Sequence, residues 1–239
     1  MQGLILLSFW KLCCNLEDNS QMTKIEKINT DGDWEYDYLY PILQDAFRVL
    51  HISYKKLYSK KLKKPYSKPA KVKKWFLEDL ITDDLIREEE KLPKAFGYRI
   101  VNQQKDATKK TRIDIAIQWS LRVGHGLADD IKIECKLLKK ENLNYIIHGG
   151  IQKFKDNKYA EKLPLAGLLT YNTFGEITEN IKLLNKKVEE KISTSDVLSH
   201  FKIIEDYQYT YTSNHQRLSN SNIDIYTMVF DFEDVIRNS

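Results

Sequence analysis

Two neighbouring segments of the chain alternate apolar and polar residues with the two-residue period of a β-strand. In residues 111–117, three isoleucines share one face and Asp114 lies on the opposite face. In residues 131–138, apolar side chains share one face, while Glu134 and Lys136 share the other. Because successive side chains of a strand point to opposite faces, two such strands side by side place an aspartate, a glutamate and a lysine on one wall of a sheet.

Further elements surround these two strands, and residues 123–126 can form the turn between them. Helices are predicted where apolar residues recur at helical spacing, and strands where short apolar runs end at turn residues. The predicted helices cover residues 34–58, 72–91, 144–163, 176–191 and 195–203. The other predicted strands cover residues 96–101, 165–171, 207–211 and 223–232. The order around the alternating segments is therefore helix, three strands, helix, strand.

The aspartate, glutamate and lysine are the residue types that metal-assisted phosphodiester hydrolysis needs. Carboxylate oxygens bind Mg²⁺ or Mn²⁺, which activates water and neutralises charge on the phosphoryl group. The acidic-x-lysine triplet alone is weak evidence, because it also occurs at residues 89–91, 130–132, 156–158 and 189–191. Three of these lie in predicted helices or helix ends, whereas residues 130–132 share the strand and face of Glu134 and stay an alternative. A solvated sheet face is the other interpretation of these charges.

Asp114 on one strand, followed by Glu-Cys-Lys at residues 134–136 on the next, resembles the motif of the PD-(D/E)xK nuclease superfamily. The resemblance covers residues 71–172 and departs from the motif at Ile113, where the proline of the superfamily's name would stand. It implies an α/β fold with a restriction-endonuclease-like core. That core is a central mixed four-stranded sheet flanked by helices in αβββαβ order. The remaining elements are then N-terminal helical and C-terminal strand additions.

The resemblance also implies a catalytic site. Asp114, Glu134 and the carbonyl oxygen of Cys135 would hold Mg²⁺ or Mn²⁺. Lys136 would orient or help deprotonate the attacking water and stabilise the transition state.

Accessory site residues follow from the same resemblance. Some superfamily members add a carboxylate from the helix before the first core strand, and Glu78 is the candidate, with residues 88–90 as alternatives. The crossing helix often carries a polar residue near the scissile phosphate, and Gln152 and Lys153 are the candidates. Each of these side chains could equally be an ordinary exposed polar residue.

Residues 55–74 are rich in lysine with tyrosines interleaved, and two prolines favour an extended or loop conformation. Such lysines can neutralise phosphates and the tyrosines can stack on unpaired bases, although a solvated linker is the alternative. A loop predicted between the last two strands carries His215 and Arg217, which could bind a phosphate or cap the loop. The candidate nucleic-acid contacts are Lys71, Lys73, Lys74, Lys153, His215 and Arg217.

The composition of the chain indicates which partners and which cellular location to expect. The formal net charge of +4 is compatible with nucleic acid binding. The three cysteines have neither disulfide-framework nor zinc-ligand spacing, so a cytoplasmic location is expected. Residues 3–10 are apolar but too short to span a bilayer, so no membrane partner is expected. We expect a mobile or upstream-start extension at residues 1–21, an N-terminal helix and lysine-rich linker at 22–70, and a nuclease domain at 71–239.

The function expected from the sequence is a Mg²⁺-dependent deoxyribonuclease, an endonuclease of a bacterial restriction or phage-defence type. Its partner would be DNA, with a homodimer or a larger defence-system assembly as its setting. The alternative is a non-catalytic nucleic-acid binding module or a partner subunit with a nuclease-like fold. The sequence leaves open DNA or RNA, single or double strands, and internal or terminal cutting.

Overall fold

The computed structural model describes residues 34–66, 74–102, 114–119, 130–160 and 162–237. Residues 35–239 form one compact unit. Several predictions lie outside the described residues: the extension at 1–21, the boundary near 70, the turn at 123–126, and the contacts Lys71 and Lys73. None of the helices in the described part of the chain combines the length and apolar character that a membrane span requires.

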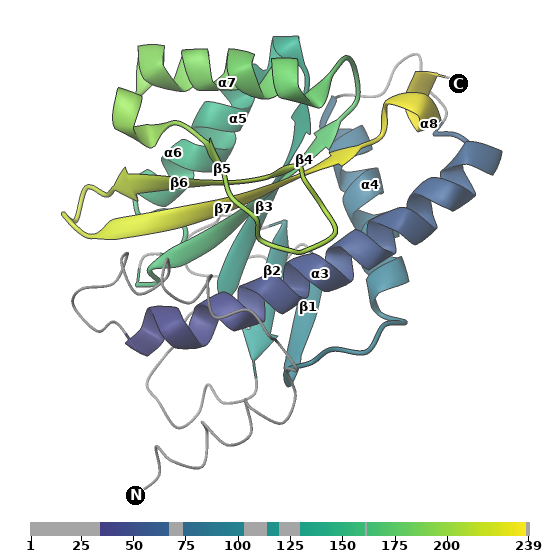
Figure 1. Cartoon of the computed structure of the whole chain (residues 1–239), viewed down its shortest axis with the longest axis horizontal. Helices are drawn as coiled ribbons and strands as arrows, with labels where there is room; N and C mark the ends of the chain where they lie inside the picture. The colour runs from purple at the N-terminus through teal and green to yellow at the C-terminus, as the bar shows by residue number, and fades with distance from the viewer. Residues whose placement is uncertain (1–33, 67–73, 103–113, 120–129, 161, 238–239) are drawn as a thin grey trace, which may run out of the picture. The chain divides into compact units, whose positions relative to one another are not determined.

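A seven-stranded mixed sheet flanked by helices organises this unit (Figure 1). The strands are β1 (Tyr98–Asn102), β2 (Ile115–Trp119), β3 (Ile131–Leu138), β4 (Leu165–Asn172), β5 (Ser199–His200), β6 (Thr210–Gln216) and β7 (Asn222–Asp231). Their spatial order is β1-β2-β3-β4-β7-β6-β5. The pairs β3–β4 and β4–β7 are parallel, and the others are antiparallel. The expected four strands are thus one side of a larger sheet that the C-terminal strands continue.

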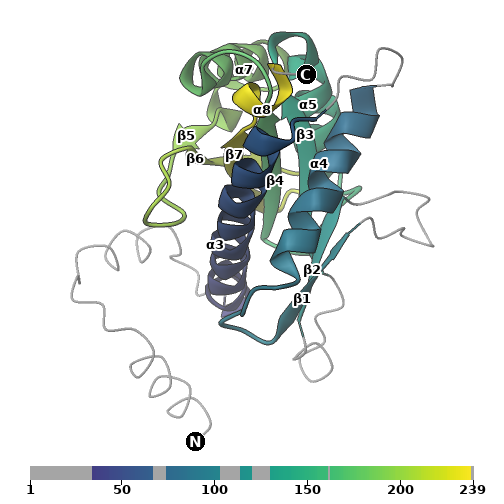
Figure 2. The same cartoon turned by 90° about the vertical axis from the view of Figure 1, so that its right-hand side faces the viewer.

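Helices cover both faces of the sheet (Figure 2). They are α3 (Trp34–Lys63), α4 (Lys74–Glu89), α5 (Leu143–Ile146), α6 (Gln152–Lys155), α7 (Ile177–Lys191) and α8 (Glu233–Arg237). On one face, Tyr54 of α3 stacks on Phe230 of β7 with ring centroids 4.4 Å apart. Thr82 of α4 lies 2.9 Å from the Tyr171 hydroxyl of β4 on that same face. The α5–α6 segment covers the opposite face, and β4 is buried along its whole length between the two layers.

The crossing helix predicted at residues 144–163 is shorter than expected and is interrupted. A π-helical turn, Ile147–Ile151, separates α5 from α6, and helical structure ends at Lys155. The turn contains Gly149 and Gly150, which lower helix stability but let the backbone approach the sheet. A Cβ at Gly149 would lie 3.3 Å from Cε of Lys136. The close approach explains why glycine stands there.

Two predictions of local structure are wrong. The helix expected at residues 195–203 is a 3-10 turn, Thr194–Asp196, followed by the edge strand β5. The loop expected at residues 213–217 lies mostly in β6, which runs to Gln216. Pairing of β5 with β6 and of β6 with β7 joins distant residues, and a local hydrophobic pattern does not reveal it.

The lysine-rich stretch is also not extended throughout, because α3 continues to Lys63. Lys60 and Lys61 form ion pairs with Glu88 and Asp84 of α4, at 2.6 Å and 2.8 Å. Basic residues in the last helical turn also interact favourably with the helix dipole. These lysines therefore join α3 to α4, and Lys74, the last of the stretch, is the first residue of α4.

Candidate active site

The site lies where β2 stops pairing with β3. Among the described residues, that pairing ends at Ile115 opposite Ile133. Buried backbone N–H groups need hydrogen-bond partners, and beyond this point carboxylates supply them. Cys135 N donates to Asp114 Oδ2 at 2.8 Å, and Leu137 N donates to Glu78 Oε2 at 3.1 Å. Where β2 no longer pairs with β3, two acidic side chains therefore occupy the free backbone N–H groups of β3.

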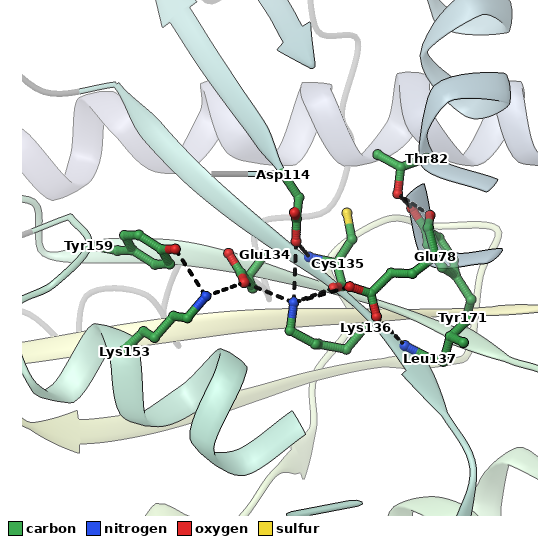
Figure 3. Close-up of polar contacts among 10 residues, drawn as sticks. All are labelled: Glu78, Thr82, Asp114, Glu134, Cys135, Lys136, Leu137, Lys153, Tyr159 and Tyr171. Atoms are coloured by element: carbon green, nitrogen blue, oxygen red, sulfur yellow. Dashed lines mark hydrogen bonds and ion pairs between the residues drawn. The ribbon is translucent and has the colours of Figure 1, made fainter. Parts of the chain in front are cut away.

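Lys136 is the centre on which these carboxylates converge (Figure 3). Its Nζ lies 2.8 Å from Glu134 Oε1, 3.3 Å from Asp114 Oδ2 and 3.4 Å from Glu78 Oε1. It also donates to the carbonyl oxygen of Cys135 at 2.6 Å. The structure therefore brings together all four residues expected at the catalytic site and the accessory carboxylate Glu78.

A second lysine reaches the same cluster from α6. Lys153 Nζ lies 2.8 Å from Glu134 Oε1 and donates to the Tyr159 hydroxyl at 3.0 Å. Lys136 and Glu134 are only 1% and 2% exposed, whereas 29% of the Lys153 side chain remains exposed. Lys153 was expected to contact nucleic acid, and it lies at the border between the buried cluster and solvent.

Burial and charge act in opposite directions on the ionisable groups. Burial by itself would lower the pKa of Lys136, but the charges of Glu134, Asp114 and Glu78 outweigh it and hold the pKa above its usual value. Burial raises the pKa of Glu78 to about 7, although the Lys136 charge opposes the shift. Lys136 is therefore protonated at neutral pH, while Glu78 exchanges a proton there.

The pKa of Glu78 gives the stability of the protein a distinct pH dependence. Because the folded-state pKa is raised from 4.5 to about 7, folding favours the protonated carboxyl, so the free energy of unfolding falls as pH rises through this window. The full fall attributable to Glu78 is about 3 kcal/mol. Chemical denaturation across this range should show a larger fall in the wild type than in Glu78→Gln, which keeps only the contribution of the other buried carboxylates, such as Glu134, whose pKa burial also raises. Parallel curves for the two proteins would contradict the raised pKa.

The other carboxylates weighed for the site lie elsewhere. Glu88 pairs with Lys60 and Lys91, and Glu89 pairs with Lys94. Asp130, from the alternative triplet, accepts a hydrogen bond from Gln118 at 3.2 Å. The hydrogen bond that Cys135 N donates to Asp114 places that carboxylate beside Glu134 rather than beside Asp130.

Three other candidates are held by protein groups away from the cluster. Gln152 donates to Asp156 at 2.6 Å, within its own helical turn. His215 is buried on β6 between Ser213 and Asp196. Arg217 is buried and donates to two backbone carbonyls, those of residues 160 and 163. The predicted loop position is therefore wrong for His215, which lies in β6, whereas Arg217 follows that strand, and both side chains are buried.

Two aromatic residues of the site were not predicted from the sequence. The ring of Tyr145 lies over Lys136, with 5.2 Å between Nζ and the ring centroid, and Tyr159 accepts the hydrogen bond from Lys153. Tyr145 lies one helical turn before Gly149. A Cβ added at Gly149 would lie 3.2 Å from the Tyr145 ring. The paired glycines were the only local signal that a ring and a helix backbone approach the sheet here.

As it stands, the cluster is an ion-paired network. In the described part of the chain, no group of three His, Cys, Asp or Glu side chains is arranged to hold a metal ion. One atom is left over: Glu134 Oε2 is buried and has no hydrogen-bond partner within the described residues. Comparisons of the chain with protein-family models, curated proteins and solved structures gave no match.

Proposed function

We propose that this chain is a metal-dependent nuclease that hydrolyses phosphodiester bonds in DNA. The observation that carries the proposal is the convergence of Asp114, Glu134 and Glu78 on the ammonium of Lys136 at the edge of β3. An acidic pair and a lysine on adjacent strands also form the motif that resembles the PD-(D/E)xK superfamily. A network needed only for stability gains little from several buried charges, because their desolvation offsets most of their attraction.

The residues present fit a divalent cation by their donor chemistry. Asp114, Glu134 and the Cys135 carbonyl offer the hard oxygen ligands that Mg²⁺ and Mn²⁺ prefer. The buried Glu134 Oε2 lacks a hydrogen-bond partner among the described residues, and a cation would satisfy it. When bound, the ion would supply an activated water and neutralise charge on the phosphoryl oxygens.

The chain's own residues have separable roles in this proposal. Lys136 stays protonated, so it donates a hydrogen bond and offers positive charge to a phosphoryl oxygen instead of acting as a base. Glu78, with a pKa of about 7, can take a proton from the attacking water and release it again. Lys153 keeps Glu134 in place, and its partly exposed side chain is available to a phosphate that approaches the cluster.

The wider setting follows from the resemblance. We infer an endonuclease of a bacterial restriction or phage-defence type that works in the cytoplasm, as a homodimer or with a larger defence-system subunit. DNA is the expected partner.

The test is incubation of purified protein with supercoiled plasmid and with short single-stranded DNA, in Mg²⁺, in Mn²⁺ and in EDTA. We expect nicking, linearisation or shortening of DNA in either metal and none in EDTA. Absence of cutting in both metals, together with DNA binding that EDTA does not affect, would replace the proposal with a binding module. Such a module is the second candidate because Lys136 already forms ion pairs with the three carboxylates without a cation.

A further inference from the structure

Two described side chains that touch the buried cluster are themselves open to solvent. Glu134 and Lys136 are almost fully buried. Beside them, Lys153 is partly exposed, and Tyr145 is 49% exposed. A molecule that approaches the cluster from this side therefore meets one cation and one aromatic ring.

Tyr145 is held in a defined position. One side of its ring faces Lys136, whose Nζ lies 5.2 Å from the ring centroid. Gly149 supports the ring from the next helical turn, where any larger side chain would press on it. This backbone is the π-helical turn, a feature that often marks functional sites. A large aromatic side chain that is fixed but half open to water offers an apolar surface that the fold itself leaves uncovered.

We propose that Tyr145 is a stacking platform for an unpaired nucleobase, so that the preferred ligand of this site is single-stranded nucleic acid. The inference builds on the proposed nuclease function and names its substrate class. With the scissile phosphate at the cluster, a neighbouring base rests on the exposed part of the Tyr145 ring. The partly exposed Lys153 beside it contacts the phosphate backbone of the nucleic acid.

The preference for single strands follows from base geometry. In a duplex, each base is stacked on its neighbours and its faces are covered, so a rigid ring on a protein surface reaches only edges and backbone. In a single strand, any base offers a free face, and stacking on an aromatic side chain is tolerant of sequence. The site should therefore prefer single-stranded over double-stranded nucleic acid and should not distinguish between base sequences.

The experiment measures binding without cleavage, by fluorescence anisotropy of a labelled single-stranded oligonucleotide in EDTA. Tyr145→Ala should weaken binding roughly 5- to 150-fold, the range for loss of one base–aromatic stack, and Tyr145→Phe should bind like wild type. An oligonucleotide of the same length with abasic positions should bind wild type and Tyr145→Ala equally. Binding to the matched duplex should be weak and should not depend on residue 145.

Phe174→Ala is the matched control. Phe174 is 60% exposed on the loop after β4, and its loss should leave the affinity unchanged. Should Tyr145→Ala unfold, Tyr145→Trp decides, since its indole fluorescence must be quenched by single strands and not by duplex. Unchanged single-strand affinity in Tyr145→Ala, or an equal loss for duplex and abasic DNA, overturns the inference. Cleavage by wild type in Mg²⁺ would then still support the nuclease. Conversely, Tyr145-dependent binding without cleavage would support the platform alone.

Discussion

Replacing Lys136 with methionine is expected to lower the free energy of unfolding by about 3–5 kcal/mol when no divalent cation is present. Methionine keeps most of the side-chain volume but removes the ammonium that contacts three carboxylates. Glu78 and Glu134 then remain buried without their shared counter-charge. The loss should grow as pH rises through about 7, because protonation of Glu78 relieves it below that pH. Chemical denaturation in EDTA at several pH values measures both effects.

A divalent cation should restore part of this stability. Mg²⁺ or Mn²⁺ that binds the folded variant at the carboxylates shifts the unfolding equilibrium by mass action. Lys182→Met is the control, because Lys182 forms an exposed ion pair with Glu179 on α7, and it should change neither stability nor metal response. A Lys136→Met protein as stable as wild type in EDTA would show that the cluster is not held together by this lysine. If neither Mg²⁺ nor Mn²⁺ raises the free energy of unfolding of Lys136→Met, the proposed cation site is contradicted.

The second large effect is expected on catalysis. Glu134→Gln and Asp114→Asn preserve side-chain shape and remove one charge each, and we expect either change to slow DNA cleavage by about a hundredfold or more. Glu134 is the acceptor that both Lys136 and Lys153 share, so loss of its charge also weakens the attraction that holds the two ammonium groups. Initial rates of DNA cleavage in Mg²⁺ measure the effect.

Asp130→Asn is the matched control for these variants. Asp130 precedes the same strand and belongs to the alternative acidic-x-lysine triplet, but its carboxylate is bonded to Gln118. We expect cleavage at close to the wild-type rate. A large loss in Asp130→Asn with normal rates in Glu134→Gln would move the site to that triplet.

Much of the sheet was readable in the sequence. The alternation in residues 131–138 placed Glu134 and Lys136 on one face, and β3 has these bounds. The apolar run at residues 165–171 predicted β4, and the helix predicted at 176–191 matches α7 within one residue. These elements carry their period within a few residues, so local patterns suffice.

Elements that depend on contacts with distant parts of the chain were harder to predict from the sequence. β5 is two residues long and exists through pairing with β6. The helix predicted to end at residue 58 continues to Lys63, and this lysine-rich end packs through ion pairs with α4 that a local pattern does not predict. Gly149 and Gly150 weaken a helix in isolation, yet here they bring a π-helical turn against β3 and β4.

The residues of the site likewise include some that local patterns predict and some that depend on contacts between distant parts of the chain. The residues of β3 that share a face could be predicted from the chain alone, because side-chain direction along a strand follows from its two-residue period. Glu78 was also predicted, although the periodicity of a helix alone could not say which of its acids reaches the sheet. The packing of the folded chain was needed to show that Glu78 rather than residues 88–90 contacts Lys136, and that Lys153 rather than Gln152 contacts Glu134. It was also needed to show that His215 and Arg217 are buried. These contacts join residues far apart in the chain, so their geometry depends on where β2 stops pairing and on how closely the helices approach the sheet.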